Sequence, residues 1–439
     1  MVAVPLLSFV VIAYNVQPYI IQCLQSVKAQ TLDDFEVIVV DDASTDGTLE
    51  CITREVADDQ RFHIIAKSEN EGAHLARRTG ALATKGQYVY FVDGDDSISA
   101  LLCEQVSMLT HASSPDIIRF GLDAFPEIGA DDGTAIAVEA VFNNAQGMRT
   151  SREIIETAFS DIISPRDVWS VTVCAYRGDS IRESFSKMTS KRRGYMEDTY
   201  EFFVIANESQ TLQNYADFHA LKYRIGAGRS GRRLYSAEEF SKRQREVHEM
   251  YLLLCEYCNS QRDDTDFYSR TSLWMKRQYL LMLVTDWVTR LPAADQDKGY
   301  TAIVETWGAA DAAIMLFDPL IARGESLLSK NSIPPGNDEF YRWGQILAKI
   351  VPMVDDGRNL PRYDQYRQLE QALEHHVAEI QLKEQQALQA EQERIEAQAR
   401  FKKGTLMRRV IDKVMPAGSL NRDLVSVIRS HAQRAKRER

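Results

Sequence analysis

The sequence predicts an α/β fold in its first half, with a mainly parallel sheet flanked by helices, followed by an α-helical C-terminal region. Short, continuous apolar runs rich in β-branched residues predict strands that are buried on both faces. Helical stretches between these runs predict crossover connections. After Leu234 the strand-like runs give way to helical apolar spacing. With 439 residues, the chain is long enough for two or three domains.

The predicted strands and helices alternate along the first hundred residues. A helix opens at Pro18, Thr45 or Asp46 can cap the next helix, and residues 73–83 form the third. Such alternation implies right-handed crossovers, and ligands of parallel sheets bind beyond the carboxyl ends of the strands. The predicted strands cover residues 8–14, 35–40, 62–65 and 87–92.

Composition divides the chain into four predicted segments. Residues 1–234 form the α/β domain, and residues 235–362 form a helical domain punctuated by prolines. Residues 363–400 contain neither Gly nor Pro and predict one long helix. Its apolar residues follow a seven-residue repeat only loosely, so a coiled coil that joins two copies and a solvated single helix are both open. Residues 401–439 form a basic tail.

The distribution of charge limits the classes of partner. A net charge of −11 argues against a nucleic-acid-binding protein. The last forty residues hold twelve Lys or Arg against three Asp or Glu. Apolar residues from Phe401 to Val414 recur at helical spacing among these cations, which suits either an anionic membrane surface or an acidic protein surface.

The N-terminal segment and the cysteines bear on the compartment. Residues 1–8 carry no basic stretch, and the apolar run that follows is too short to span a bilayer. The six cysteines form neither a zinc ribbon nor a redox motif. We therefore expect a cytoplasmic protein, with peripheral contact to the inner face of the cytoplasmic membrane through the tail.

Three adjacent carboxylates follow the fourth predicted strand. Asp93, Asp95 and Asp96 repel one another unless a positive charge lies among them. A hard divalent cation is the natural partner, because Mg²⁺ takes one or two carboxylates together with substrate phosphates. The alternative is a turn with a helix N-cap at Asp96 or Ser97.

Other strand ends and loops supply further polar groups. Asp41 and Asp42 end the second strand, where they can accept hydrogen bonds from a base or a ribose, and Arg77 can reach base or phosphate. The sequence has neither a glycine-rich dinucleotide fingerprint nor a Walker motif. A nucleotide must therefore be held by side chains and a metal. A third acidic cluster, Glu197-Asp198, lies about a hundred residues later.

Four segments of the first hundred residues, in this order and spacing, resemble the successive signatures of glycosyltransferase family 2. The resemblance ends near Leu234. It has two departures, because Ala43 stands where Gly is more common and Arg78 stands where Asn is usual. The matching segments are VVIAYN (10–15), VDDASTDGT (40–48), NEG leading to AR (70–77) and GQYVYFVDGDD (86–96).

The resemblance implies a GT-A fold, a nucleoside diphosphate sugar donor such as a UDP-sugar, and Mn²⁺ or Mg²⁺ as cofactor. Asp93 and Asp95 would form the metal-binding pair, with Asp96 in support. Asp198 would be the catalytic base, with Glu197 beside it. The residues expected around the nucleotide are Ala13, Tyr14, Asn15, Asp41, Asp42, Arg77 and Asp93.

The expected reaction is an inverting transfer to a hydroxyl of a glycan or a lipid-linked acceptor, in the synthesis of a bacterial surface polysaccharide such as a capsule. A basic, glycine-rich segment suggests either a lid over the diphosphate, through Arg224, Arg229 and Arg232, or a linker. Two other functions fit the same residues. One is a sugar nucleotidyltransferase, and the other is a non-catalytic, nucleotide-binding subunit of a biosynthetic assembly.

Overall fold

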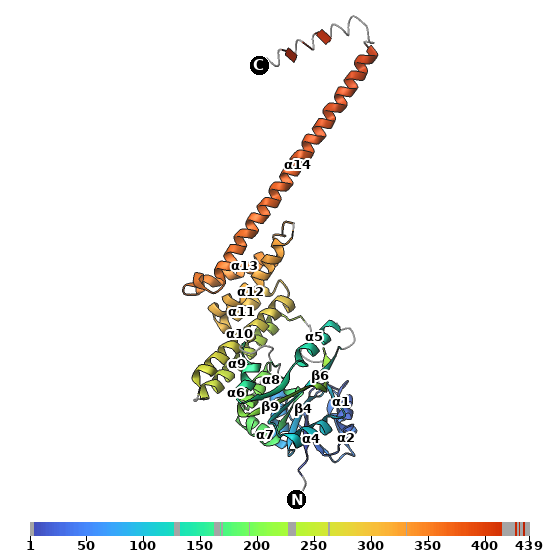
Figure 1. The fold of residues 1–439 in the computed structure, drawn as a ribbon, viewed down its shortest axis with the longest axis vertical. Helices are drawn as coiled ribbons and strands as arrows, with labels where there is room; N and C mark the ends of the chain where they lie inside the picture. Colours follow the sequence, from blue (N-terminus) through green and yellow to red (C-terminus); the bar gives the residue numbers. More distant parts are fainter. Residues whose placement is uncertain are drawn as a thin grey trace. The chain divides into compact units, whose positions relative to one another are not determined.

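The computed structural model describes two compact units (Figure 1). The first comprises Met1–Met315 and Ile350–Val354, and the second comprises Leu316–Lys349 and Asp355–Arg439. The described residues are 4–126, 132–161, 167, 170–192, 194–226, 234–261, 264–330, 332–414, 426–427, 430 and 433–434.

One sheet forms the centre of the first unit. Its strand order is β3-β2-β1-β4-β8-β6-β9-β5, and β7 pairs with β9. Strands β1 to β4 are parallel and follow the four predicted runs, which confirms the α/β fold class. Among the described residues the strands are β1 (Leu7–Ala13), β2 (Phe35–Asp41), β3 (Phe62–Ala66), β4 (Tyr88–Asp93), β5 (Ser97–Ile98), β6 (Ile117–Pro126), β7 (Gln146–Thr150), β8 (Cys174–Arg177) and β9 (Thr211–Ile225).

Burial explains why the first strands are continuous apolar runs. Every residue of β1 and β2 is buried, because neighbouring strands and helices cover both faces of the sheet. The second half of the sheet is mixed. Strand β8 runs antiparallel to both β4 and β6, and β9 runs parallel to β6.

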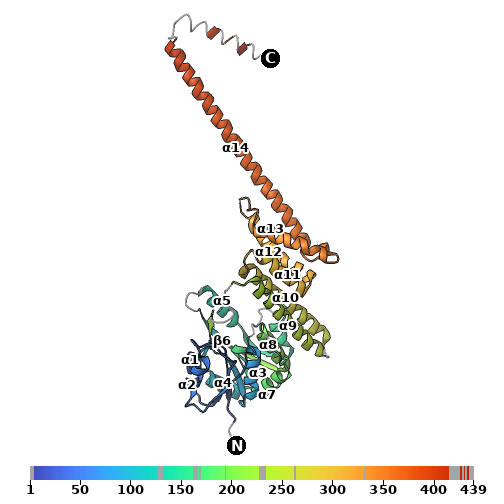
Figure 2. The ribbon, with the colours of Figure 1, turned by 180° about the vertical axis from the view of Figure 1, so that it is seen from behind.

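Helices flank this sheet. Three of them, α3, α7 and α8, contact one another, as seen from behind in Figure 2. The helices of the α/β part are α1 (Ile20–Lys28), α2 (Thr48–Val56), α3 (Ala73–Ala83), α4 (Leu102–Ala112), α5 (Asp132–Phe142), α6 (Arg152–Ala158), α7 (Gly178–Lys187) and α8 (Glu197–Glu208).

The predicted helical stretch after Leu234 consists of two helices, α9 (Ala237–Ser260) and α10 (Thr265–Arg290). Each start has a side-chain cap. Ser236 and Glu239 form a capping box at α9, and the Asp264 carboxylate accepts a hydrogen bond from the Phe267 amide at α10. Helix α11 (Gln296–Trp307) follows in the first unit, and α12 (Ala309–Leu328) continues into the second.

The second unit contains α13 (Glu339–Ile350) up to Lys349 and the 52-residue helix α14 (Tyr363–Val414). Leu373 and Ile380 of α14 are buried, whereas Leu388 and Ile395 are exposed. The helix runs through the predicted junction at residues 400 and 401. Among the described residues, no helix is both long enough and apolar enough to cross a membrane.

Candidate active site

The acidic turn after β4 exposes two of its three carboxylates. Asp93 and Asp95 are partly exposed, whereas Asp96 is buried and accepts a hydrogen bond from the Arg224 amide at 2.8 Å. Burial raises the pKa of Asp96 to about 8, and the charges of Asp95 and Asp93 add to the rise. Gly94 lets the turn form, because a Cβ there would lie 2.9 Å from the Ile12 carbonyl oxygen.

Arg224, at the end of β9, ties this turn to the sheet. Its Nε donates to the Asp95 carbonyl oxygen at 3.0 Å, and an Nη donates to Gln22 Oε1 at 2.7 Å. The guanidinium lies over the rings of Tyr19 and Phe125, 4.7 Å from each centroid. The structure therefore places the side chain of Arg224 against the acidic turn. The other two predicted lid residues, Arg229 and Arg232, lie outside the described residues.

A buried ion-pair network lies beside the turn. Arg77 of α3 donates through one Nη to Asp93 Oδ1 at 3.1 Å and through the other to Glu201 Oε2 at 3.1 Å. Glu201 is fully buried, and its second oxygen contacts Nδ1 of the buried His74 at 2.8 Å. The charges of Asp93 and Glu201 raise the pKa of Arg77, so its guanidinium stays charged despite burial. The network thus links the acidic turn to α8.

His74 also ties this network to the backbone before α8. Its Nε2 lies 2.9 Å from the Thr189 carbonyl oxygen, which only accepts, so Nε2 is the donor of this hydrogen bond. Nδ1 is the ring nitrogen that faces Glu201.

One of the two carboxylates that start α8, that of Asp198, faces the same cavity as Asp93 of the acidic turn. Arg77, Asp93 and Asp198 all line a cavity of about 490 Å³. Burial raises the pKa of Glu197 to about 7, with the charge of Asp198 as the second cause. Burial also raises the pKa of Asp198, while Arg77 lowers it. The remaining wall is mainly apolar and includes Leu122, Val138, Phe142, Ala158, Val171, Val173, Leu221 and Tyr223.

The residues predicted around a nucleotide gather where β1 and β2 end. The Asp42 amide donates to the Ala13 carbonyl oxygen at 2.8 Å, and Tyr14 is exposed. Asn15 Oδ1 accepts from the Thr45 amide at 2.7 Å and so holds the β2–α2 loop. These contacts put the ends of both strands at one edge of the sheet.

Asp41 and Asp42 are buried and differ in their contacts. The Asp42 carboxylate accepts from the amides of Glu71 and Gly72 and pairs with Lys67 at 3.1 Å, so it holds the loop before α3. Asp41 accepts from the Ser44 amide through one oxygen, and its other oxygen is buried without a hydrogen-bond partner. Asp41 therefore retains acceptor capacity that a ligand donor can satisfy.

Three residues of this region were not among those predicted from the sequence: Glu201, His74 and Lys67. The signal for Glu201 was a carboxylate within the apolar run Tyr-Glu-Phe-Phe-Val-Ile, because such a group is buried only when it is paired. His74 gave no comparable signal, since its partners lie more than a hundred positions away. Lys67 pairs with the nearby Glu71, but its pairing with Asp42 is not visible in the sequence.

The acidic turn fits a divalent cation that is shared with a ligand. Within the described ranges, no group of three or more His, Cys, Asp or Glu side chains is arranged to hold a metal alone. Asp93 and Asp95 offer two partly exposed carboxylates, and Mg²⁺ in nucleotide sites uses one or two together with phosphate oxygens. Asp96, which is buried and bonded to Arg224, supports the turn.

Comparison with known proteins agrees with this architecture. Residues 8–124 match the family model for glycosyl transferase family 2. Among curated proteins, the uncharacterized glycosyltransferase EpsJ of Bacillus subtilis (strain 168) is 36% identical over 118 residues, which cover 27% of this chain and 34% of that protein. The putative teichuronic acid biosynthesis glycosyltransferase TuaG of the same strain is 39% identical over 92 residues, covering 21% and 36%. The matches thus span about a third of each relative.

Solved structures show the same fold. The crystal structure of S. aureus TarS 1-349 in complex with UDP-GlcNAc matches with a TM-score of 0.52 and 17% identity, covering 73% of this chain and 87% of that one. The strand order, the acidic turn after β4 and the family match all agree with this fold. Residues 8–124 therefore match glycosyl transferase family 2, within an α/β domain of GT-A fold.

Proposed function

We propose that the protein transfers a sugar, with inversion, from a nucleoside diphosphate sugar to a hydroxyl of a glycan or a lipid-linked acceptor. The observation that carries this proposal is the shared cavity, which Arg77 and Asp93 line together with Asp198. Arg77 and Asp93, the candidate donor-binding residues, therefore share one cavity with Asp198, the candidate base. A UDP-sugar is the proposed donor.

Asp198 is the proposed general base. The acceptor oxygen attacks the anomeric carbon, the bond from this carbon to the diphosphate oxygen breaks, and the hydroxyl proton passes to the Asp198 carboxylate. Attack opposite the leaving group inverts the anomeric centre. The raised pKa of Asp198 suits this role, because a base is most effective when its pKa lies near the working pH.

Asp93 and Asp95 would hold the cation, Mn²⁺ or Mg²⁺. When bound, it would supply positive charge to the departing diphosphate. Arg77 holds Asp93 in place from the protein side. Asp41, with its unpaired buried oxygen, and Asp42 lie where we propose that the base and ribose bind, alongside Ala13, Tyr14 and Asn15.

A panel of nucleotide sugars, incubated with and without Mn²⁺ and scored for release of nucleoside diphosphate, tests the activity. We expect release with one donor class, and Asp198→Asn should lower kcat by about 10²–10⁴-fold. Asp217→Asn on the exposed side of β9 is the matched control and should leave kcat unchanged. A wild-type rate in Asp198→Asn would exclude this base.

The same panel separates the two other functions. A nucleotidyltransferase would instead consume a nucleoside triphosphate and a sugar phosphate and release pyrophosphate. A non-catalytic assembly subunit would bind UDP and release nothing from any donor.

We also propose that the basic tail contacts an anionic membrane surface, at the inner face of the cytoplasmic membrane. Phe401, Leu406, Met407 and Val410 are exposed, and cations lie between them in the sequence. Deletion of residues 401–439 should abolish sedimentation with phosphatidylglycerol vesicles, whereas sedimentation with neutral phosphatidylcholine vesicles should be weak for both forms. Equal sedimentation of both forms with anionic vesicles would contradict this contact.

We further propose a biological setting for the protein and self-association through its long helix. Relatives such as TuaG suggest the synthesis of a bacterial surface polysaccharide, with a capsule as one candidate product. Exposed Leu382, Leu388 and Ile395 support a coiled coil between two copies through residues 363–400. Sedimentation velocity of the full chain, compared with a form in which these three residues are Gln, tests this: the wild type should be a dimer and the variant a monomer.

A further inference from the structure

The turn that leads into α8 has a backbone conformation that needs support from its neighbours. Met196, the residue before Glu197, has φ 61° and ψ 21°, a left-handed conformation that side chains with a Cβ seldom adopt. Its position sets the direction in which α8 starts. The direction of this first turn determines where the carboxylates of Glu197 and Asp198 point.

Helix α9 supports this turn through two side chains that are one helical turn apart. The guanidinium of Arg243 lies over the ring of Tyr195, 4.3 Å from the centroid. Gly194 lies directly against Glu246, because a Cβ at Gly194 would come within 2.5 Å of Glu246 Oε2. Two residues of the turn therefore contact α9 immediately before the first turn of α8.

Arg243 is itself fixed by helix α10. Its Nε lies 3.0 Å from Asp286 Oδ2, and both side chains are about one-tenth exposed. The other Asp286 oxygen accepts from Arg290 at 3.2 Å. This buried pair holds the guanidinium over Tyr195, because any movement of Arg243 would leave the Asp286 carboxylate with one cation fewer in a place with little water.

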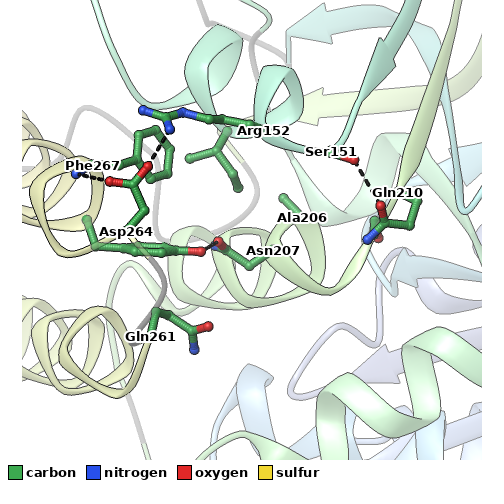
Figure 3. A pocket seen from close by; sticks show the side chains of 11 residues that line it. Ser151, Arg152, Ala206, Asn207, Gln210, Gln261, Asp264 and Phe267 are labelled. Carbon is green, nitrogen blue, oxygen red and sulfur yellow. Dashed lines mark hydrogen bonds and ion pairs between the residues drawn. The ribbon is translucent and has the colours of Figure 1, made fainter.

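The same two helices hold the far end of α8. Tyr268 of α10 donates from its hydroxyl to Asn207 Oδ1 at 2.7 Å, and Tyr257 of α9 donates to Glu208 at 3.2 Å. Close by, Asp264 pairs with Arg152 of α6, as Figure 3 shows. Helix α9 thus contacts α8 at its far end and the turn just before its start, and α10 contacts the far end directly and the start through Arg243. Helix α8 cannot slide or rotate without breaking these contacts.

We infer that Arg243 is a positioning residue for Asp198: through Tyr195 and Asp286 it locks the start of α8, so that the helices after the α/β domain are part of the catalytic apparatus. This inference rests on the proposed role of Asp198. A positioning role is sensitive to small movements, since misplacing a reacting group by on the order of 1 Å can cost about 100-fold in rate.

The test compares Arg243→Ala, Arg243→Lys and the control Arg245→Ala, an exposed arginine on the same helix. With the donor that the panel identifies, we expect Arg243→Ala to lower kcat by about 10- to 100-fold. The Kd for UDP should change by less than about threefold, because no described contact joins Arg243 to the nucleotide residues. Lys keeps the charge opposite Asp286 and should recover part of kcat, and Arg245→Ala should match the wild type.

Hydrogen exchange on the full chain gives a readout that needs no donor. Arg243→Ala should speed amide exchange in residues 194–200 and leave the acidic turn at 88–98 unchanged, whereas Arg245→Ala should change neither. Unchanged exchange in residues 194–200, or a wild-type kcat in Arg243→Ala, would overturn the inference. If instead Asp198→Asn keeps full activity while Arg243→Ala shows faster exchange, the base assignment fails and the structural coupling stands.

Discussion

Glu201 offers the sharpest test of the buried network, because two substitutions of this residue should differ in a predictable order. In Glu201→Gln the side-chain oxygen can still accept from Arg77, which lies 3.1 Å away. The new amide can donate to Nδ1 of His74, provided that the imidazole keeps only the proton on Nε2 that it donates to Thr189. Every polar atom then keeps a partner. Glu201→Leu removes both acceptors.

The free energies of unfolding follow from these partners. Removing one member of a buried ion pair costs about 3–5 kcal/mol, and that is the loss expected for Glu201→Leu. Glu201→Gln exchanges charge-assisted hydrogen bonds for neutral ones, so we expect a loss of about 1–2 kcal/mol. In a unit of this size, 1 kcal/mol shifts the melting temperature by about 2 °C, so Leu should lower Tm by about 6–10 °C and Gln by about 2–4 °C.

Thermal unfolding, followed by circular dichroism at one pH and salt concentration, measures both shifts, and UDP binding reports on the donor site. Glu208→Gln at the other end of α8 is a control for removing a helix carboxylate that is partly exposed. If Gln destabilises the protein as much as Leu does, the proposed difference between keeping and losing the hydrogen-bond partners of Glu201 is refuted. A Tm of Glu201→Leu within 1–2 °C of the wild type would contradict the burial of an ion pair at this position.

Three further predictions follow from the site. Burial raises the pKa of Asp198 above that of an ordinary aspartate, and a base must be ionised, so kcat should fall as the pH drops through this raised pKa. A kcat that stays constant down to the ordinary aspartate range, about pH 4, would contradict this. Ala43 has φ 59°, a left-handed conformation that costs less for Gly, so Ala43→Gly should raise the free energy of unfolding by about 0.5 kcal/mol. The control Ala137→Gly lies within helix α5, where Gly is unfavourable, and should lower it by about 1 kcal/mol. Arg224→Ala removes the hydrogen bonds to the Asp95 carbonyl oxygen and to Gln22, which are worth about 1–2 kcal/mol. A loss of this size in the free energy of metal binding corresponds to a rise of about tenfold in the Mn²⁺ concentration for half-maximal turnover. Lys222→Ala should cause no rise.

The parallel half of the fold could be predicted because its signal is local. Strands such as 35–41 are buried along their whole length, so they appear as mainly apolar runs, here interrupted only by Glu36 before the closing Asp41. The carboxylates that follow the second and fourth strands were expected at one sheet edge. Asp198 does not follow a strand but begins helix α8, and it lines one cavity together with Asp93. The strand Cys174–Arg177 joins the two halves of the sheet. With four residues it is too short to show a recognisable hydrophobic periodicity in the sequence.

The side chains that hold Asp93 and Asp96 in place could not be predicted, because each contact joins residues that are far apart in the chain. Glu201 meets Arg77 across 124 positions, and Arg224 meets Asp96 across 128. No periodicity within one segment encodes such a pairing. The departure at Ala43 is different in kind, since its left-handed backbone explains after the fact why glycine is more common there.

The place of β9 in the sheet has a consequence for biosynthesis. Among the described residues this strand is the last in sequence, yet it lies between β6 and β5 and also pairs with β7. A ribosome releases β5 more than a hundred residues before the strand with which it pairs. The nascent domain therefore exposes open strand edges until residue 225 has emerged, and this interval is when aggregation or chaperone capture would compete with folding.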